Sequence, residues 1–513
     1  MALHLYDTLQ RELRLFTPIE KNKVGLYCCG PTVYNFQHIG NLRTYLFEDI
    51  LRRVLEYYGY SVNHVINITD VGHLTSDGDT GQDKMEASAI RTGETAWSLA
   101  KKYTDSFKDD LQQLNILEPN MWCKATDHIQ EQIESIKTIE SNGYTYQTSD
   151  GIYFDTSRLD DYGHLARLDV NGLQAGARVD LGEKRKITDF ALWKFSPLEE
   201  KRQMEWDSPW GIGFPGWHIE CSAMSNKYLG KFFDIHCGGE DHIPVHHTNE
   251  IAQAQACYHT RLANFWIHGA FLQLDGMKMS KSSGDFLRLK TLTDYGYDPL
   301  AYRFFCLGAR YRAKLTFGWE SLGAASKAFT RLRKAAISWG EPTIVNRNFT
   351  QRFEDYINDD LNMPRVLALV WELVGSDLEN GIKKATLLHF DQVLGLDIKN
   401  VETNKNAQNI SEIPKKIEDL AILRQDARLE KDWVKADLLR NEIIAAGFEI
   451  EDREDGHLIT PKLPPQIKKW IHERNSAREM KDWSLADQIR EKITEAGFEI
   501  VDSPSGTEAR PIS

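Results

Sequence analysis

The spacing of apolar and polar residues predicts an α/β core at the start of the chain. Val24 to Cys28 is an apolar run of strand length, and Ser61 to Thr69 predicts a second strand. Between them, apolar residues recur at the three-to-four spacing of a helix: Leu42, Tyr45, Leu46, Ile50, Val54 and Leu55. Strand, helix and strand in this order form a βαβ unit, so the pattern predicts a Rossmann-like parallel sheet.

An insert interrupts this core. A glycine- and aspartate-rich loop from Asp70 to Lys84 precedes helical patterns that run to about Leu114. Residues from about 144 to 195 then predict short strands and turns, after a helix that Gly143 stops. That helix is marked by Ile129, Ile133, Ile136 and Ile139.

The core resumes after the insert. Helices are expected at Trp217–Tyr228 and His246–Cys257, on either side of a strand at Phe232–His236. Residues from about 322 to 394 are helical throughout, which predicts a bundle, and an asparagine-rich linker follows at about 397 to 411.

The end of the chain is a duplication. Residues from Ala427 to Ile450 recur from Ala477 to Ile500 at a constant offset of 50, including a shared Lys-Asp-Trp triplet that ends at Trp433 and at Trp483. A constant offset over many identities indicates a duplicated module, here expected as two helices followed by a strand. A tryptophan at helical spacing is more often a core residue than a platform for nucleotide bases.

The length and composition are typical of a globular protein with several domains. It has 513 residues, of which 41% are hydrophobic and 27% charged. No apolar run is long enough for a bilayer, and early charges such as Asp7 and Arg11 argue against a secretory leader. Seven scattered cysteines favour a reducing, cytoplasmic location. With a net charge of −13, a nucleic-acid partner would need a locally positive surface.

The stretch CGPTVYNFQHIGNLR, from Cys29 to Arg43, predicts a nucleotide site. A strand, a glycine-containing turn and a helix N-terminus together present backbone N–H groups and the helix dipole to a phosphate. His38 and Asn41 add donors there, and the thiol of Cys29 faces the same crevice.

Two further sets of residues could each have either a functional or a purely structural role. Cys29, Cys221, His246 and Glu250 could hold a tetrahedral zinc, or could be two buried thiols and a helical pair. From spacing alone we favour the structural interpretation, because no CxxC pair anchors a metal site. The lysine–serine loop, Lys278 to Ser282, could stabilise a triphosphate or could be a solvated hairpin tip.

Taken together, these motifs resemble class I aminoacyl-tRNA synthetases. His38-Ile-Gly-Asn41 follows the first strand and Lys278-Met-Ser-Lys-Ser282 the last. Longer runs are similar to cysteinyl-tRNA synthetase, a resemblance that extends to the first tail module. These runs are Cys29 to Tyr34, Asn67 to Asp70, Gln174 to Asp180, Ser208 to Gly211, Pro215 to Met224 and His246 to Gln253.

The resemblance implies one zinc ion per chain, held by Cys29, Cys221, His246 and Glu250. Cys28 does not occupy the matching place. The zinc would select cysteine by accepting its thiolate, which a serine hydroxyl cannot match, so no editing step is expected.

The resemblance also implies the substrate sites. ATP, with Mg²⁺, would be bound by His38, Gly40, Asn41, Asp241, Lys278 and Lys281, of which His38, Asn41, Lys278 and Lys281 would be catalytic. Cysteine would lie against Gly30, Thr69, Trp217 and His236. By the same resemblance, the carboxylate of cysteine would attack the α-phosphorus of ATP and release pyrophosphate, and the resulting cysteinyl-adenylate would esterify the terminal ribose of tRNA(Cys).

Three departures from the family pattern stand out. Asn41 replaces a second histidine, Cys237 stands where glycine is common, and the C-terminal module is present twice.

The expected fold is a Rossmann-like catalytic core with an inserted subdomain, a helical bundle and duplicated α+β modules. The core is expected at 1–120 and 190–290 and the connective insert at 121–189. A stem-contact region at 291–320, a tRNA-binding bundle at 321–396, an anticodon module at 412–460 and its copy at 462–505 are expected to follow. A cytoplasmic monomer is expected.

Two rival functions remain open at this point. A cysteine ligase with an amino-sugar acceptor would share the catalytic half and lack the tail, and a non-catalytic RNA-binding relative would have lost its site residues. The residues from about 320 onward disfavour the first rival, and the intact motifs disfavour the second.

Overall fold

The computed structural model describes most of the chain, in two compact units. The described residues are 2–71, 83–168, 183–197, 202–274, 287–400, 415–445, 448–453, 456–461, 465–479, 482–495, 498–503 and 506–511. One unit comprises Met1–Leu289, Pro299–Phe317 and Arg331–Val401. The other comprises Lys290–Asp298, Gly318–Thr330 and Glu402–Ser513.

A five-stranded sheet forms the centre of the first unit, and all its neighbouring strands pair in parallel. The predicted Rossmann-like sheet is therefore confirmed. Cys28 pairs in register with Cys237 on one side and Ile66 on the other. The order across the sheet is β11 (Ala263–Gly269), β10 (Phe233–Gly239), β3 (Lys23–Cys28), β4 (Ser61–Ile68) and β5 (Met121–Lys124).

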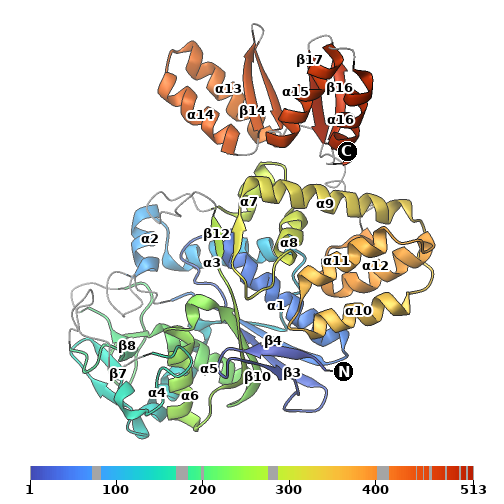
Figure 1. Cartoon of the computed structure of the whole chain (residues 1–513). Coiled ribbons are helices and arrows are strands. Elements are labelled where there is room, and N and C mark those ends of the chain that lie inside the picture. Colours follow the sequence, from blue (N-terminus) through green and yellow to red (C-terminus); the bar gives the residue numbers. More distant parts are fainter. Residues whose placement is uncertain are drawn as a thin grey trace. The chain divides into compact units, whose positions relative to one another are not determined.

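Helices cover this sheet (Figure 1). Helix α1 (Ile39–Tyr57) buries the apolar positions expected from its spacing and packs against β4, β10 and β11. Helix α5 (Trp217–Leu229) packs against β3 and β4, and α6 (His246–Tyr258) packs against α5. Gly230, with φ of 86°, ends α5, a backbone conformation that glycine adopts readily.

The insert forms a second sheet, which is antiparallel. Its strands are β6 (Thr145–Gln147), β7 (Gly151–Phe154), β8 (Phe190–Phe195) and β9 (Gly213–Pro215). Helix α4 (Ile129–Ser141) packs its isoleucines against β7 and β8 in one apolar cluster. β5 belongs to the parallel sheet, although it lies at the start of the range expected for the insert.

The remaining elements of the first unit complete its margins and its helical part. They are β1 (His4–Asp7), β2 (Glu12–Leu15), α2 (Lys84–Thr92), α3 (Ala96–Gln113), β12 (Leu272–Leu274), α8 (Pro299–Leu307), β13 (Leu315–Phe317), α10 (Arg347–Asn358), α11 (Met363–Val374) and α12 (Asn380–Leu394), with 3-10 turns at Ala125–His128, Thr156–Arg158, Glu240–His242 and Ile398–Asn400. Helices α7 (Leu289–Asp294) and α9 (Trp319–Ser338) have residues in both units.

A buried arginine joins the helical part to the core within the first unit. The Arg303 guanidinium is fully buried and pairs with Asp49 of α1 at 2.5 Å. It also donates to the carbonyls of Leu394, Leu114 and Asn115, at 2.7, 3.0 and 3.2 Å. A buried cation needs such partners, and here they come from three different parts of the chain.

The two tail copies have the same elements at the same offset. The first copy is α13 (Lys415–Leu429), α14 (Trp433–Ala445), β14 (Phe448–Arg453) and β15 (Gly456–Pro461). The second is α15 (Pro465–Glu479), α16 (Trp483–Glu495), β16 (Phe498–Ser503) and β17 (Gly506–Pro511). The expectation of one strand per copy was wrong, because each copy ends in an antiparallel hairpin.

The tail tryptophans also differ from the expectation of a core position. Trp433 and Trp483 each begin a helix and are 57% and 59% exposed. Helix positions that contribute to the core of the first copy are instead held by smaller aliphatic residues such as Ile417 and Ile443.

Candidate active site and metal centre

The four predicted metal ligands lie together in the first unit. Cys29 follows strand β3, Cys221 is on α5, and His246 and Glu250 are one turn apart on α6. Each offers a ligand atom within 4.8 Å of the others, and all four side chains are buried. The sequence expectation that these residues meet is therefore confirmed in geometry, since this cluster could hold a metal ion.

The separations between ligand atoms fit a tetrahedral zinc. Ligand atoms bonded to one such ion lie about 3.3–3.8 Å apart. Cys29 Sγ lies 4.0 Å from Cys221 Sγ and 3.8 Å from Glu250 Oε1, and His246 Nε2 lies 3.1 Å from Glu250 Oε1. Burial raises the pKa of the Cys29 and Cys221 thiols, so a cation is needed to hold both as thiolates.

A second possible ligand set overlaps the first. Cys29 and Glu250 also meet His236 and His247, again with ligand atoms within 4.8 Å of one another. His247 Nε2 lies 3.2 Å from Cys29 Sγ, and His236 Nε2 lies 2.8 Å from Glu250 Oε2. Sequence reasoning missed His247, although the adjacent pair His246-His247 was the available signal.

Neighbouring rings fix the orientation of these histidines. Nδ1 of His246 shares a hydrogen bond with Nδ1 of His218 at 3.0 Å, which leaves Nε2 facing the cluster. Nδ1 of His247 is hydrogen-bonded to Nε2 of His268 at 2.8 Å. The ring of Trp217, expected beside the amino acid, lies 4.3 Å from that of His246. Such outer partners hold metal-binding side chains in place.

The predicted phosphate site is the capped N-terminus of α1. The Asn41 N–H donates to Nδ1 of His38 at 3.1 Å, and the His38 N–H donates to Oδ1 of Asn41 at 3.3 Å. Burial lowers the pKa of His38, so its ring is neutral near pH 7 and, with Nδ1 accepting, carries its proton on Nε2. A Cβ at Gly40 would lie 3.0 Å from the His38 ring, so glycine leaves room for the ring to fold back over the turn.

Other expected contact residues surround these two features. Gly30 follows Cys29, and its N–H donates to Oδ1 of Asn67 at 2.7 Å. A Cβ there would lie 1.6 Å from the Asn67 carbonyl oxygen, so only glycine fits. Thr69 is buried and accepts from Nδ2 of Asn67 at 3.2 Å. Asp241 is exposed in the turn after β10, and its charge acts on the pKa of His38.

Two motifs that the sequence singles out are not described. Lys278 and Lys281 fall within residues 275–286, and the run from Gln174 to Asp180 falls within 169–182, both outside the described residues.

The fold and the site define a class I aminoacyl-tRNA synthetase catalytic domain. The family model described as the tRNA synthetases class I (C) catalytic domain matches residues 15–327. The chain belongs to the cysteine–tRNA ligases of that class.

Three curated relatives support this assignment. Cysteine–tRNA ligase 1 of Burkholderia lata is 58% identical over 475 residues, which cover 91% of this chain and 100% of the relative. The cysteine–tRNA ligase of Zymomonas mobilis is 43% identical, with 87% of this chain and 95% of the relative covered. That of Treponema denticola is 41% identical, with 88% and 98% covered.

Among the described residues, no helix is both long and apolar enough to cross a membrane.

Proposed function

We propose that this chain activates cysteine with ATP and transfers it from cysteinyl-adenylate to the terminal ribose of tRNA(Cys). The observation that carries this proposal is the buried Cys29–Cys221–His246–Glu250 cluster at the end of strand β3. The same strand end leads through a short turn to the capped N-terminus of α1. A thiol-selecting metal site and a phosphate site are thus consecutive along one βα unit.

We propose that the cluster holds one zinc ion per chain through Cys29, Cys221, His246 and Glu250. When bound there, zinc supplies a site that prefers the thiolate of cysteine to the hydroxyl of serine. His218 and Trp217 orient His246, and His236 holds the second oxygen of Glu250. We also assign Gly30, Thr69, Trp217 and His236 to the wall that faces the amino acid.

ATP, with Mg²⁺, is assigned to the N-terminus of α1. Nε2–H of His38, the backbone at Gly40 and the side chain of Asn41 are donors for its phosphates, and the helix dipole favours the same charge. We assign Asp241 to the ribose, and Lys278 and Lys281 to the charge that develops on the departing pyrophosphate. Because the two lysines stabilise a charge that moves during the reaction, we expect them to affect the rate of adenylate formation more than the binding of substrates.

The remaining parts of the chain are assigned to tRNA. We propose catalytic-core segments at 1–120 and 190–290, a connective insert at 121–189 and a stem-contact region at 291–320. The bundle at 321–396 would bind tRNA, and the module at 412–460 would reach the anticodon, with 462–505 as an accessory copy. We propose a monomer that acts in the cytoplasm, where charged tRNA is consumed.

The test is to measure cysteine-dependent ATP–pyrophosphate exchange and then charging of tRNA(Cys). We expect both activities, with serine failing to support exchange. Exchange without tRNA charging, but with transfer of cysteine to an amino sugar, would favour the alternative ligase. Absence of exchange from protein with its metal bound would contradict the proposal.

A further inference from the structure

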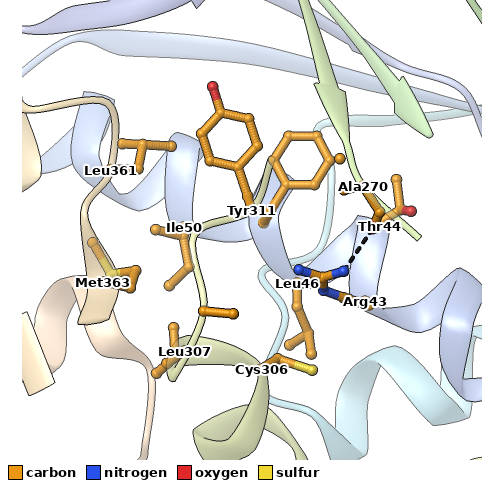
Figure 2. A pocket seen from close by; sticks show the side chains of 13 residues that line it. Arg43, Thr44, Leu46, Ile50, Ala270, Cys306, Leu307, Tyr311, Leu361 and Met363 are labelled. Carbon is orange, nitrogen blue, oxygen red and sulfur yellow. Dashed lines mark hydrogen bonds between the residues drawn. The ribbon is translucent and has the colours of Figure 1, made fainter. Parts of the chain in front are cut away.

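Arg43 is a buried arginine on α1 whose partners are main-chain carbonyls from two distant segments. It is 5% exposed and lies five residues after His38. Its Nη1 donates to the carbonyls of Ala270 and Phe271, each at 2.7 Å. Its Nη2 donates to those of Ala313, at 2.5 Å, and Arg310, at 3.3 Å. Figure 2 shows the guanidinium reaching Ala270 beside a small cavity.

These two segments lead into a pair of short strands. Ala270 and Phe271 immediately precede β12, and residues 310–313 precede β13, which pairs with β12 in parallel. The two segments also bond to each other, because the Ala270 N–H donates to the Tyr311 carbonyl at 2.8 Å. The Phe271 N–H donates to Oε1 of Glu240 at 2.7 Å. The guanidinium therefore fixes the start of β12 directly on α1.

The chain returns to the same helix on the other side of residues 275–286. The Ile39 N–H, in the first turn of α1, donates to the Leu287 carbonyl at 2.9 Å. The guanidinium of Arg288 lies 3.4 Å from the ring centre of Phe36, in the turn before α1. Both described ends of the segment that contains Lys278 and Lys281 are thus attached to the helix that presents His38 and Asn41.

The contacts of Arg43 require a guanidinium group. A cavity of about 30 Å³ lies beside it, lined mostly by aliphatic and aromatic side chains. Tyr311, which also lines this cavity, stacks on Phe47 with ring centres 5.1 Å apart and donates its hydroxyl to Asp360 at 2.6 Å. A planar guanidinium can reach four carbonyls at once, whereas a lysine ammonium has three donors at a single point.

We propose that Arg43 is a positioning residue for adenylate formation. Arg43 fixes Ala270 and Phe271, which precede the segment that contains Lys278 and Lys281, relative to the phosphate site at the N-terminus of α1. This rests on the proposed function. A displacement of about 1 Å can cost on the order of 10²-fold in rate. Weaker attachment of Ala270 and Phe271 to α1 should therefore lower kcat more than it weakens substrate binding.

The test compares Arg43→Lys with Arg303→Lys in the full-length, metal-bound protein. Arg303 is a matched control, because it is also buried on carbonyls but ties α1 to α12 instead of to β12. We expect R43K to lower kcat of cysteine-dependent pyrophosphate exchange by about 10²-fold, with KM for cysteine and zinc content within about twofold of wild type. R303K should lower Tm with kcat within about twofold.

A second variant keeps the test independent of whether R43K folds. Glu240→Ala keeps the Arg43 side chain and its carbonyl partners but removes the acceptor of the Phe271 N–H, and should lower kcat by about tenfold with KM for cysteine unchanged. Wild-type kcat in both R43K and E240A, or loss of kcat only in step with loss of zinc, would overturn the positioning role. Absence of exchange from the wild-type protein would instead contradict the proposed function itself.

Discussion

The two overlapping metal sets share Cys29 and Glu250 and differ in their other two residues. If Cys221 and His246 complete the site, Cys221→Ser should lose most of the bound zinc, because a serine hydroxyl is a poor ligand. His247→Asn should then retain about one zinc per chain. Zinc content of the purified variants measures this, with Cys257→Ser as a control at a half-buried thiol outside both sets. Full occupancy in C221S with loss in H247N would assign the second set.

Asp110 should make the stability of the protein depend on pH. It is buried on α3, and burial raises its pKa to about 7, against the opposing charge of Arg288. In the unfolded chain an aspartate has a pKa of about 3.9, so the folded state holds this proton more tightly. The contribution of Asp110 to the free energy of unfolding is therefore largest below about pH 4 and falls as the pH rises to about 7. Asp110→Asn removes the titration, so its Tm should exceed that of wild type by a margin that grows from about pH 4 to 7 and is then constant.

A neighbouring aspartate provides the control for this pH dependence. Asp105 is exposed on the same helix, five residues before Asp110, so Asp105→Asn should leave the pH profile of Tm unchanged. If D110N and wild type have parallel profiles between pH 5 and 8, the Asp110 carboxyl titrates in the folded protein much as it does in the unfolded chain.

Some site residues could be predicted from sequence and others could not. Cys29 and Cys221 are 192 positions apart, so spacing alone did not show that their thiols meet, and the ligand set depended on long motifs shared with a family. Arg43 was not predicted as a site residue, because its partners are carbonyls of residues 227 to 270 positions away. Carbonyl partners leave no mark in the sequence.

Among the elements, α1 combines helix capping with the proposed binding of ATP, and one substitution can separate the two. Asn41→Asp keeps an oxygen acceptor for the His38 N–H, and its charge suits a helix N-terminus. We therefore expect Tm to be unchanged or slightly raised. The same carboxylate should repel phosphate, so KM for ATP in pyrophosphate exchange should rise by at least about tenfold.

The matched control for this substitution is Asn346→Asp. Asn346 caps α10 by accepting from the Phe349 N–H at 3.1 Å, with no role in the site. N346D should likewise keep Tm and leave KM for ATP unchanged. Wild-type kinetics in N41D would remove Asn41 from the phosphate site and leave it as a cap only.

Elements were predictable where one periodicity dominated a long segment. The apolar run before Cys29 and the helical spacing after it gave β3 and α1, and two of the isoleucines of α4 are completely buried. Short edge elements were not predicted, such as β9 at Gly213–Pro215 and the second strand of each tail hairpin. In β15, the run Gly456–Pro461 has few apolar residues, so its pairing with β14 is what defines it as a strand.

At the scale of the whole molecule, the duplicated tail is where the family resemblance helps least. The alignment with the Burkholderia relative covers all of that protein but leaves 9% of this chain unmatched, about the size of one copy. Both copies expose a tryptophan at the start of a helix, and Arg428 lies 5.9 Å from the ring centre of Trp433. Exposed aromatic and basic side chains together suit the stacking of unpaired bases, which supports the assignment of the first copy to the anticodon.

Deleting residues from about 462 onward tests this division of the chain. The parallel sheet, the metal cluster and the N-terminus of α1 all precede residue 300, so pyrophosphate exchange should be unchanged. KM for tRNA should rise by no more than a few-fold, because the first copy remains. In the full-length protein, Trp433→Ala should raise that KM by about tenfold, the cost of one lost stacking contact, whereas Trp483→Ala, at an equally exposed position, should change it by less than twofold. Loss of exchange on deletion would mean that the second copy supports the catalytic fold.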